Sequence, residues 1–183
     1  MTDAFPLLGE PLALDLVNTR TAEGDLLDGP SALAAWLEQQ SARLTPPAEV
    51  GEAELAAVRA VREATRAALD AVRAGGRPEL HALNAALAAA PAYRELSWDA
   101  SGPSVTVHRA ATPDRALAAE LAEAAVDLLT DPKASRIRAC EAADCVLIFL
   151  PAHPRRRWCV ATTCGNRTRV ARYYARHKGE PQS

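Results

Sequence analysis

Aromatic side chains are scarce in this chain of 183 residues, where Phe, Tyr and Trp together account for only 4% of the sequence. Hydrophobic residues still make up 49% of the chain, and alanine and leucine dominate them. Such a composition favours helices packed through small side chains over a sheet-rich core. We therefore predict a mainly α protein, long enough for one domain with a substantial core and a small appended module.

Long apolar runs are also missing. No stretch approaches the roughly 18 to 20 apolar residues that a membrane-spanning helix needs. The first residues, MTDAFPLLGEPLALDL, lack the basic region followed by a long apolar region that marks an export signal. We therefore expect a soluble, cytoplasmic protein without a membrane partner.

Several motifs that carry catalysis are absent. The chain has no Gly-rich phosphate loop, no HExxH pair, and no evident Ser or Cys nucleophile with a nearby histidine. His81 stands alone on a predicted helix, which is typical of a packing or surface residue. We expect no enzyme activity and assign no catalytic residue.

Cysteine is used four times, always near the C-terminus. Cys140 and Cys145 form one C-x4-C pair, Cys159 and Cys164 form a second, and thirteen residues separate the two pairs. Two disulfides or four buried thiols are the alternatives, but disulfides require an oxidising compartment. Paired thiols in a short span suit the tetrahedral coordination of Zn²⁺. Four thiolates would leave no position for a reactive water, so we predict a structural zinc ion.

Charge is divided unevenly along the chain. Residues 1–132 hold 10 basic and 20 acidic side chains, a net charge of -10, whereas residues 133–183 hold 11 basic and 3 acidic side chains, a net charge of +8. This asymmetry predicts a polyanion-binding C-terminal part. It also allows the acidic part to hold the basic part closed until an effector or a nucleic acid displaces it.

Two blocks near the second cysteine pair carry a resemblance to a known family. They are RRRWC at 155–159 and CGNR at 164–167, and with the upstream cysteine pair they resemble the CGNR zinc finger family. The resemblance implies that Cys164 opens a basic helix. The zinc module is then similar to a treble clef or a zinc ribbon, with the metal fixing the helix to the ribbon. We expect residues 146–150 and 155–160 to form that ribbon as an antiparallel pair.

A second resemblance lies near the N-terminus. LALDLVNT at 12–19, followed by a Leu-x-x-Trp-Leu helix at 33–37, is similar to the ABATE domain, which is described as a stress-induced transcription regulator module and usually precedes a CGNR finger. The resemblance implies an ABATE-like domain over residues 1–132 that senses an effector or partner, or forms a homodimer. A zinc finger that binds DNA would follow over residues 133–183, beyond a hinge at Thr130-Asp131-Pro132.

The basic residues of the zinc module are the candidate DNA contacts, because almost no carboxylate balances them between 146 and 178. The alternatives are a solvated basic face, or a protein-interaction adaptor that docks on an acidic partner or an RNA-bearing complex. The candidates are Arg155, Arg156, Arg157, Arg167, Arg169, Arg172, Arg176 and Lys178.

In the N-terminal domain, periodicity and turn signals predict helices over 30–42, 52–74, 78–90 and 112–129. Alternation predicts a β-hairpin made of 93–98 and 104–108. Arginines recur along the second of these helices at Arg59, Arg62, Arg66 and Arg73, and nearby carboxylates indicate a solvated, salt-bridged face.

Three polar residues stand beside the first apolar run, namely Asp15, Asn18 and Thr19. One interpretation is structural: short polar side chains commonly cap such a run or pin it to neighbouring backbone. The other is functional, with the three residues forming the polar rim of an effector pocket.

Overall fold

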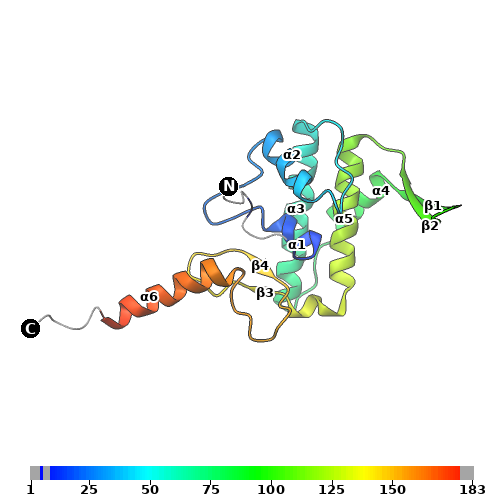
Figure 1. Ribbon diagram of the computed structural model, residues 1–183. Helices are drawn as coiled ribbons and strands as arrows, with labels where there is room; N and C mark the ends of the chain where they lie inside the picture. Colours follow the sequence, from blue (N-terminus) through cyan, green and yellow to red (C-terminus); the bar gives the residue numbers. More distant parts are fainter. Residues whose placement is uncertain (1–4, 6–8, 178–183) are drawn as a thin grey trace, which may run out of the picture.

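The computed structural model describes Phe5 and residues 9–177 of the chain (Figure 1). A helical body carries a β-hairpin at one end, and a small module with a projecting helix lies at the other. The elements in chain order are α1 (Leu12–Val17), α2 (Pro30–Gln39), α3 (Glu52–Arg73), α4 (His81–Ala89), β1 (Ala92–Asp99), β2 (Gly102–Arg109), α5 (Pro113–Thr130), the 3-10 helix η1 (Pro132–Arg136), β3 (Arg138–Ala139), β4 (Ile148–Phe149), the π-helical turn η2 (Ala161–Gly165) and α6 (Asn166–His177).

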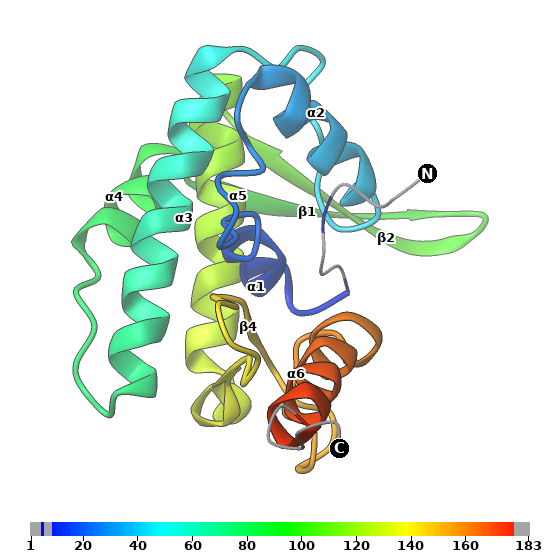
Figure 2. The ribbon, with the colours of Figure 1, turned by 90° about the vertical axis from the view of Figure 1, so that its left-hand side faces the viewer.

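Helices α3 and α5 run side by side through the centre of the body, and α1, α2 and α4 pack around them (Figure 2). The buried face of α3 carries Leu55, Val58 and Leu69 at helical spacing. The facing side of α5 is rich in buried alanine, including Ala122 and Ala125. Small side chains let the two helices pack together without large aromatic residues between them, as the composition predicts. The prediction of a mainly α fold is confirmed.

Helix boundaries lie close to the predicted ones, with one informative exception. Helix α4 begins at His81, three residues after Pro78, because the carboxylate of Glu79 accepts the backbone N–H of His81 and forms a local turn first. Within the described part of the chain, no helix is long and apolar enough to cross a membrane.

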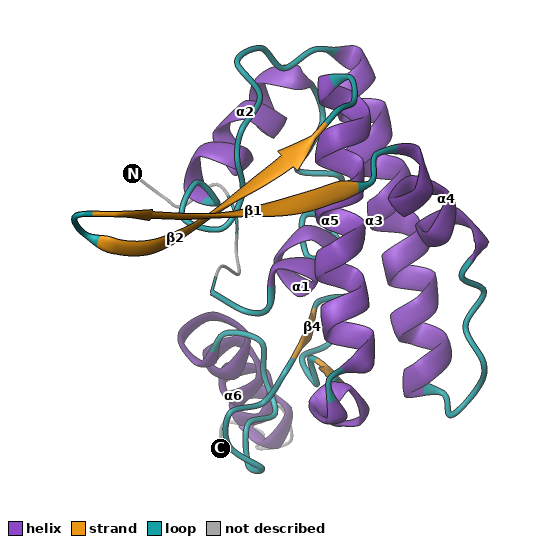
Figure 3. Ribbon diagram, turned by 90° about the vertical axis from the view of Figure 1, so that its right-hand side faces the viewer, coloured by secondary structure: helices purple, strands orange, loops and turns teal. Residues whose placement is uncertain are grey.

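The β1–β2 hairpin extends away from the helices (Figure 3). Its strands pair antiparallel in an unbroken register from Ala92 opposite Arg109 to Asp99 opposite Gly102. The turn is fixed by Asp99, which accepts the backbone N–H of Ser101 at 2.7 Å. Gly102 follows with φ of 110°, a conformation that other residues rarely adopt. The hairpin is therefore a defined projection on a rigid base.

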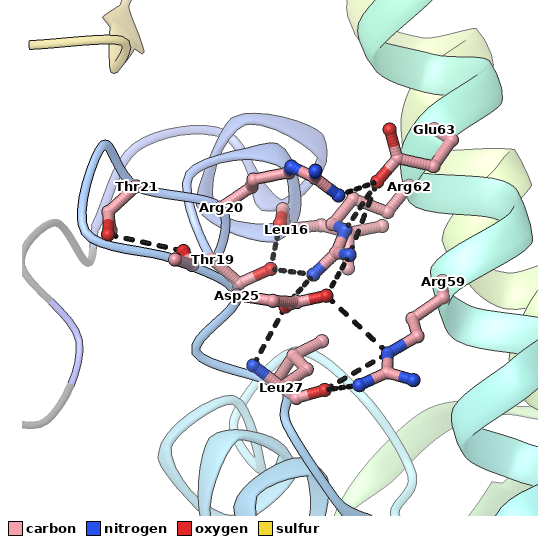
Figure 4. Close-up of polar contacts among 10 residues, drawn as sticks. Leu16, Thr19, Arg20, Thr21, Asp25, Leu27, Arg59, Arg62 and Glu63 are labelled. Carbon is pink, nitrogen blue, oxygen red and sulfur yellow. Dashed lines mark hydrogen bonds and ion pairs between the residues drawn. The ribbon is translucent and has the colours of Figure 1, made fainter.

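One arginine of α3 contradicts the prediction of a solvated face. Arg62 is only 2% exposed, and its guanidinium binds both carboxylate oxygens of Asp25 at 2.6 Å and the hydroxyl of Thr19 at 3.0 Å (Figure 4). Arg59 donates to the carbonyl of Leu27 in the same loop. The interpretation was wrong for Arg62 because the loop after α1 folds over α3, a contact that helical spacing cannot reveal.

The Arg62–Asp25 pair predicts an acid-sensitive component of stability. Burial opposes ionisation of Asp25, but hydrogen bonds from Arg62 and from the N–H of Leu27 outweigh it and lower the pKa of this carboxyl. Its stabilisation is therefore complete above the unfolded pKa of about 3.9 and is lost as the pH falls through the lower folded value. Asp25→Asn should lower the free energy of unfolding at pH 7 by about 3 kcal/mol, because the buried Arg62 loses its two-pronged carboxylate partner and keeps only the half-exposed Glu63 as an anion.

Denaturant unfolding at pH 7 and at stepwise lower pH measures this effect. Asp28→Asn is the matched control, since Asp28 is exposed and lies three residues away. A variant at position 25 as stable as the control at pH 7 would show that the buried pair contributes nothing.

The junction between the helical body and the C-terminal module is packed. Asp131 caps the following turn by accepting the backbone N–H of Lys133 at 2.7 Å. Ala134, Ile137 and Ile148 are buried in the same core cluster as the helices. The predicted hinge is thus a short, ordered connection, and the core continues from one part of the chain into the other.

Candidate metal centre and basic helix

Four cysteine sulfurs, those of Cys140, Cys145, Cys159 and Cys164, converge in the C-terminal module within 4.8 Å of one another. The sulfur of Cys145 lies 3.8 Å from those of Cys159 and Cys164, and the last two are 3.5 Å apart. Sulfurs bound to one zinc ion at about 2.3 Å stand roughly 3.8 Å apart along the edges of the tetrahedron. The four positions therefore fit a single tetrahedral zinc ion.

The disulfide alternative does not describe this arrangement. All four cysteines are free, and the measured sulfur separations are far longer than the roughly 2.05 Å of a disulfide bond. A bound zinc ion would cross-link the two cysteine pairs. The four sulfurs would fill all four of its coordination positions.

Two tight backbone turns present the sulfurs. In the first, the N–H of Cys140 donates to the carbonyl of Leu147 at 2.9 Å, and Asp144 adopts a positive φ of 61° that reverses the chain. In the second, the carbonyl of Val160 accepts the N–H groups of both Cys164 and Gly165, which widens the turn to π-helical geometry. The longer C-x4-C spacing is accommodated by these turns.

Burial makes two of the thiols, Cys145 and Cys159, reluctant to ionise without a cation. It raises the pKa of Cys145 to about 11 and also raises the pKa of Cys159. Burial opposes ionisation of Cys140 as well, but N–H groups of Ala142 and Cys159 outweigh it and lower the pKa of that thiol. A divalent ion is what the other sulfurs need to carry charge together.

The strand pairing inside the module differs from the predicted ribbon. Strand β4 pairs with β3, which precedes the first cysteine, through Arg138 opposite Phe149 and Ala139 opposite Ile148. The segment 155–160 forms no strand, and among the described residues it meets the first turn through one backbone–backbone hydrogen bond, from the N–H of Glu141 to the carbonyl of Arg157. The prediction was wrong because both edges of β4 are occupied: β3 pairs along one edge, and the side-chain amide of Asn18 bonds to both polar backbone groups of Ile148 on the other.

The start of α6 is fastened to the metal centre. The hydroxyl of Thr168 donates to the carbonyl of Cys164 at 2.8 Å, and Arg167 donates to the Cys164 sulfur at 3.7 Å. Trp158 packs against Gly165, where an added Cβ would stand 3.4 Å from the indole ring. The module is treble-clef-like: one tight turn, then a second ligand pair at the beginning of a helix.

Beyond its first turn, α6 projects into solvent (Figure 1). None of its residues is buried, and Val170, Tyr173 and Tyr174 are more than half exposed. Five of the predicted nucleic-acid contacts are exposed on or near this helix and form no ion pair among the described residues, namely Arg155, Arg167, Arg169, Arg172 and Arg176. Lys178 lies outside the described residues.

The other two predicted contacts have partners within the protein. Arg156 forms an ion pair with Glu10 at 2.8 Å and stacks 4.3 Å above the ring of Phe149. Arg157 donates to Glu141 at 2.7 Å, which holds the pKa of that carboxyl below its usual range. Arg156 in particular joins the module to the helical body and is not displayed for a ligand.

Asn18 connects the helical body to the metal module. Its side-chain amide donates to the carbonyl of Ile148 at 2.8 Å and accepts the N–H of Ile148 at 3.0 Å, as a neighbouring strand would. Glu10 accepts the N–H of Leu150 at 2.9 Å, and Arg66 donates to the carbonyl of Val146. The sequence pattern singled out Asn18, but no signal pointed to Glu10 or to Ile148.

Asp15 and Thr19 are also used inside the protein. Asp15 accepts the backbone N–H groups of Gly9 and Glu10 and pairs with Arg43, while Thr19 donates to the carbonyl of Leu16. Asp15, Asn18 and Thr19 are each 1% exposed. Their contacts favour the structural interpretation, and the effector pocket stays a prediction without an assigned lining.

The fold and the four-sulfur site define a class of protein, a helical domain fused to a treble-clef-like zinc finger. Residues 10–132 match the ABATE family, described as a putative stress-induced transcription regulator, and residues 136–177 match the CGNR zinc finger. The ABATE match covers about two thirds of the chain, which therefore belongs to that family. No curated protein matches the chain in sequence.

Cys164→Ser should remove the metal and release α6. A serine hydroxyl is a far weaker zinc ligand than a thiolate, and α6 has few other attachments. We expect bound zinc to fall from about one ion per chain to nearly none, with loss of helical circular dichroism. The helical body should keep its cooperative unfolding, because its core does not include the sulfurs.

Thr163→Ala is the control for this variant, since Thr163 is exposed beside Cys164. Metal analysis of reduced protein that finds no zinc in the unmodified chain, with α6 folded, would refute the site.

Asn18→Ala should weaken the attachment of the metal module to the helical body but leave the zinc ion bound. The substitution leaves the buried N–H and carbonyl of Ile148 without partners, which costs about 2 to 4 kcal/mol of unfolding free energy. Zinc content should stay at the level of the unmodified protein.

Chemical denaturation with metal analysis measures both quantities. Asn84→Ala, an exposed position on α4, should change stability by about 0.5 kcal/mol or less. Equal effects of the two variants would mean that the Asn18 bonds do not couple the two parts.

Proposed function

We propose that this protein is a cytoplasmic, nucleoid-associated transcription regulator whose zinc finger binds DNA through α6. The observation that carries the proposal is a helix that buries none of its residues and bears four arginines and no carboxylate. A helix that served only to stabilise the fold would bury one face. The zinc ion has a structural role in this proposal, and the protein is not an enzyme.

The dimensions of α6 suit a DNA groove. Twelve residues extend about 18 Å, and a major groove of about 12 Å width accepts a helix of this kind. Arg172 and Arg176 lie one turn apart on the exposed part of the helix and can each reach a phosphate. Val170 and Tyr174 lie nearby and offer apolar contacts to sugars or bases.

Docking of the basic module on the protein's own acidic domain is less well supported. Among the described residues, no ion pair joins an arginine of α6 to a carboxylate of the helical body, and the pair that does cross the junction involves Arg156. The basic helix is therefore presented outward. An acidic protein partner or an RNA-bearing complex stays the alternative, which the same experiment separates from DNA.

The test is a titration of fluorescent duplex DNA across salt concentrations. Each phosphate contact contributes a slope of about -0.9 in log affinity against log salt. Arg172→Ala with Arg176→Ala should therefore flatten the slope by about 2 and weaken binding about tenfold or more at 100 mM salt. These two side chains make no contact with the sulfurs, so zinc content should not change.

Arg115→Ala serves as the control, because Arg115 is an exposed arginine on α5 of the acidic domain. Absence of DNA binding at low salt, or binding that the double substitution leaves intact, contradicts the proposal. Preference for an acidic polypeptide or RNA over duplex DNA in competition would select the adaptor alternative.

In this proposal the helical domain has a regulatory role under stress, through an effector, a protein partner or self-association. The family description supports a regulatory role. The packed junction supports the transmission of a conformational change from the helical domain to the metal module. A change in the segment around Glu10 acts directly on Leu150 and Arg156 of that module.

A further inference from the structure

The β1–β2 hairpin has one polar and one apolar face. Directly opposed residues lie on the same side of a hairpin, and the sides alternate along each strand. Tyr93, Glu95, Ser97, Ser104, Thr106 and His108 therefore share one face. The other face, called the apolar face below, consists of Arg94, Leu96, Trp98, Pro103, Val105 and Val107.

The two faces differ in how many contacts their side chains make within the protein. On the polar face, His108 lies 2.7 Å from the carboxylate of Glu95 and stacks on Tyr93 with ring centroids 4.9 Å apart. On the apolar face, Trp98 is 79% and Leu96 is 73% exposed. An isolated two-stranded hairpin is marginally stable in water, and a large exposed apolar patch commonly marks an interaction surface.

We propose that the apolar face is the contact surface for a second copy of this chain. The two hairpins pack face to face about a two-fold axis that passes beside the opposed pair Leu96 and Val105. A two-fold interface requires a surface that is complementary to itself. The apolar face meets this requirement because Arg94 and Trp98 lie two residues on either side of Leu96, each roughly 6.6 Å away.

The two-fold axis brings Arg94 of each copy over Trp98 of the other. A guanidinium above an indole ring is a favourable cation–π pair. Within the described residues, the side chain of Arg94 has no hydrogen bond or ion pair, and no carboxylate stands on the apolar face to neutralise it. A surface with an aromatic ring at this position and apolar groups opposite Leu96 and Val105 is complementary to the apolar face, and a second copy supplies both.

Area and access also suit a second copy. With ordinary side-chain sizes, the exposed parts of the six residues offer roughly 600 to 700 Å² per copy, against about 800 Å² per partner in standard interfaces. The hairpin reaches beyond the helices (Figure 3). At its base, Val107 lines a pocket with Pro47 and Glu120 of the helical body, so the accessible part of the apolar face lies toward the turn. Both strands also keep an unpaired outer edge within the described structure.

The experiment is sedimentation or light scattering of the full-length, zinc-loaded protein over a wide concentration range. The unmodified chain should reach twice its mass of 19.5 kDa. Leu96→Glu with Val105→Glu places two charges at the centre of the interface and should raise the dimer dissociation constant roughly 30-fold or more. The matched control is Ser97→Glu with Ser104→Glu, which puts an equally opposed pair of charges on the polar face and should leave the dimer intact.

A smaller change tests the predicted cross-contact. Arg94→Glu should weaken the dimer and Arg94→Lys should largely restore it, because lysine retains the cation. A chain that stays at 19.5 kDa at every concentration, or a dimer that survives the substitutions on the apolar face, overturns the inference. Association lost equally in the Ser97 and Ser104 control overturns it too, since the apolar face would then not be the contact. The result is independent of DNA binding, which is measured separately on α6.

Discussion

The amide of Asn18 bonds to both polar backbone groups of Ile148, and this contact sets where the metal module stands on the helical body. A zinc site organises only the residues close to its ligands, so it cannot orient itself relative to a domain 120 residues upstream. Asn18 does so by acting as a substitute strand beside β4. Glu10 and Arg66 add bonds to Leu150 and Val146 on the same stretch of chain. The apolar part of this contact is Ile137 and Ile148, which enter the helical core.

Acidic and basic charge are separated in the fold as they are in the sequence, yet the two parts hardly neutralise each other. Among the described residues, the ion pair that crosses the junction uses Arg156 and none uses an arginine of α6, a helix that projects away from the helical body (Figure 1). Cohesion at the junction therefore comes mainly from hydrogen bonds between side chains and backbone and from apolar packing, which salt screens less than exposed ion pairs. The exposed basic charge is left available for a polyanion. The junction between the helical body and the metal module is therefore physically distinct from the surface proposed to bind DNA.

Features set by local chain geometry could be predicted from the sequence, whereas features set by distant contacts could not. The helical spacing around Leu55 and Leu117 identified α3 and α5 to within one or two residues. The four cysteines were identified because two sulfurs in one tight turn are a local signature. By contrast, the pairing of β4 with β3, the burial of Arg62 and the bond from Glu10 to Arg156 join segments that share no periodic pattern. Asn18 falls between these cases. Its position beside an apolar run identified it as a candidate residue, but its partner, Ile148, lies 130 residues away and could not be predicted.

The attachment of α6 gives this helix the mechanics of a lever arm. It is fixed at one end by Cys164, Gly165 and Thr168, and the rest of its length of about 18 Å has no lateral support. A rotation of about 10° at the zinc ion would carry the far end of the described helix through about 3 Å, a large step relative to the spacing of DNA phosphates. Glu10, in the segment that Asp15 pins, is bonded to Leu150 and Arg156 of the metal module, so small shifts beside α1 would move the module from which the arm projects and would be amplified at its tip.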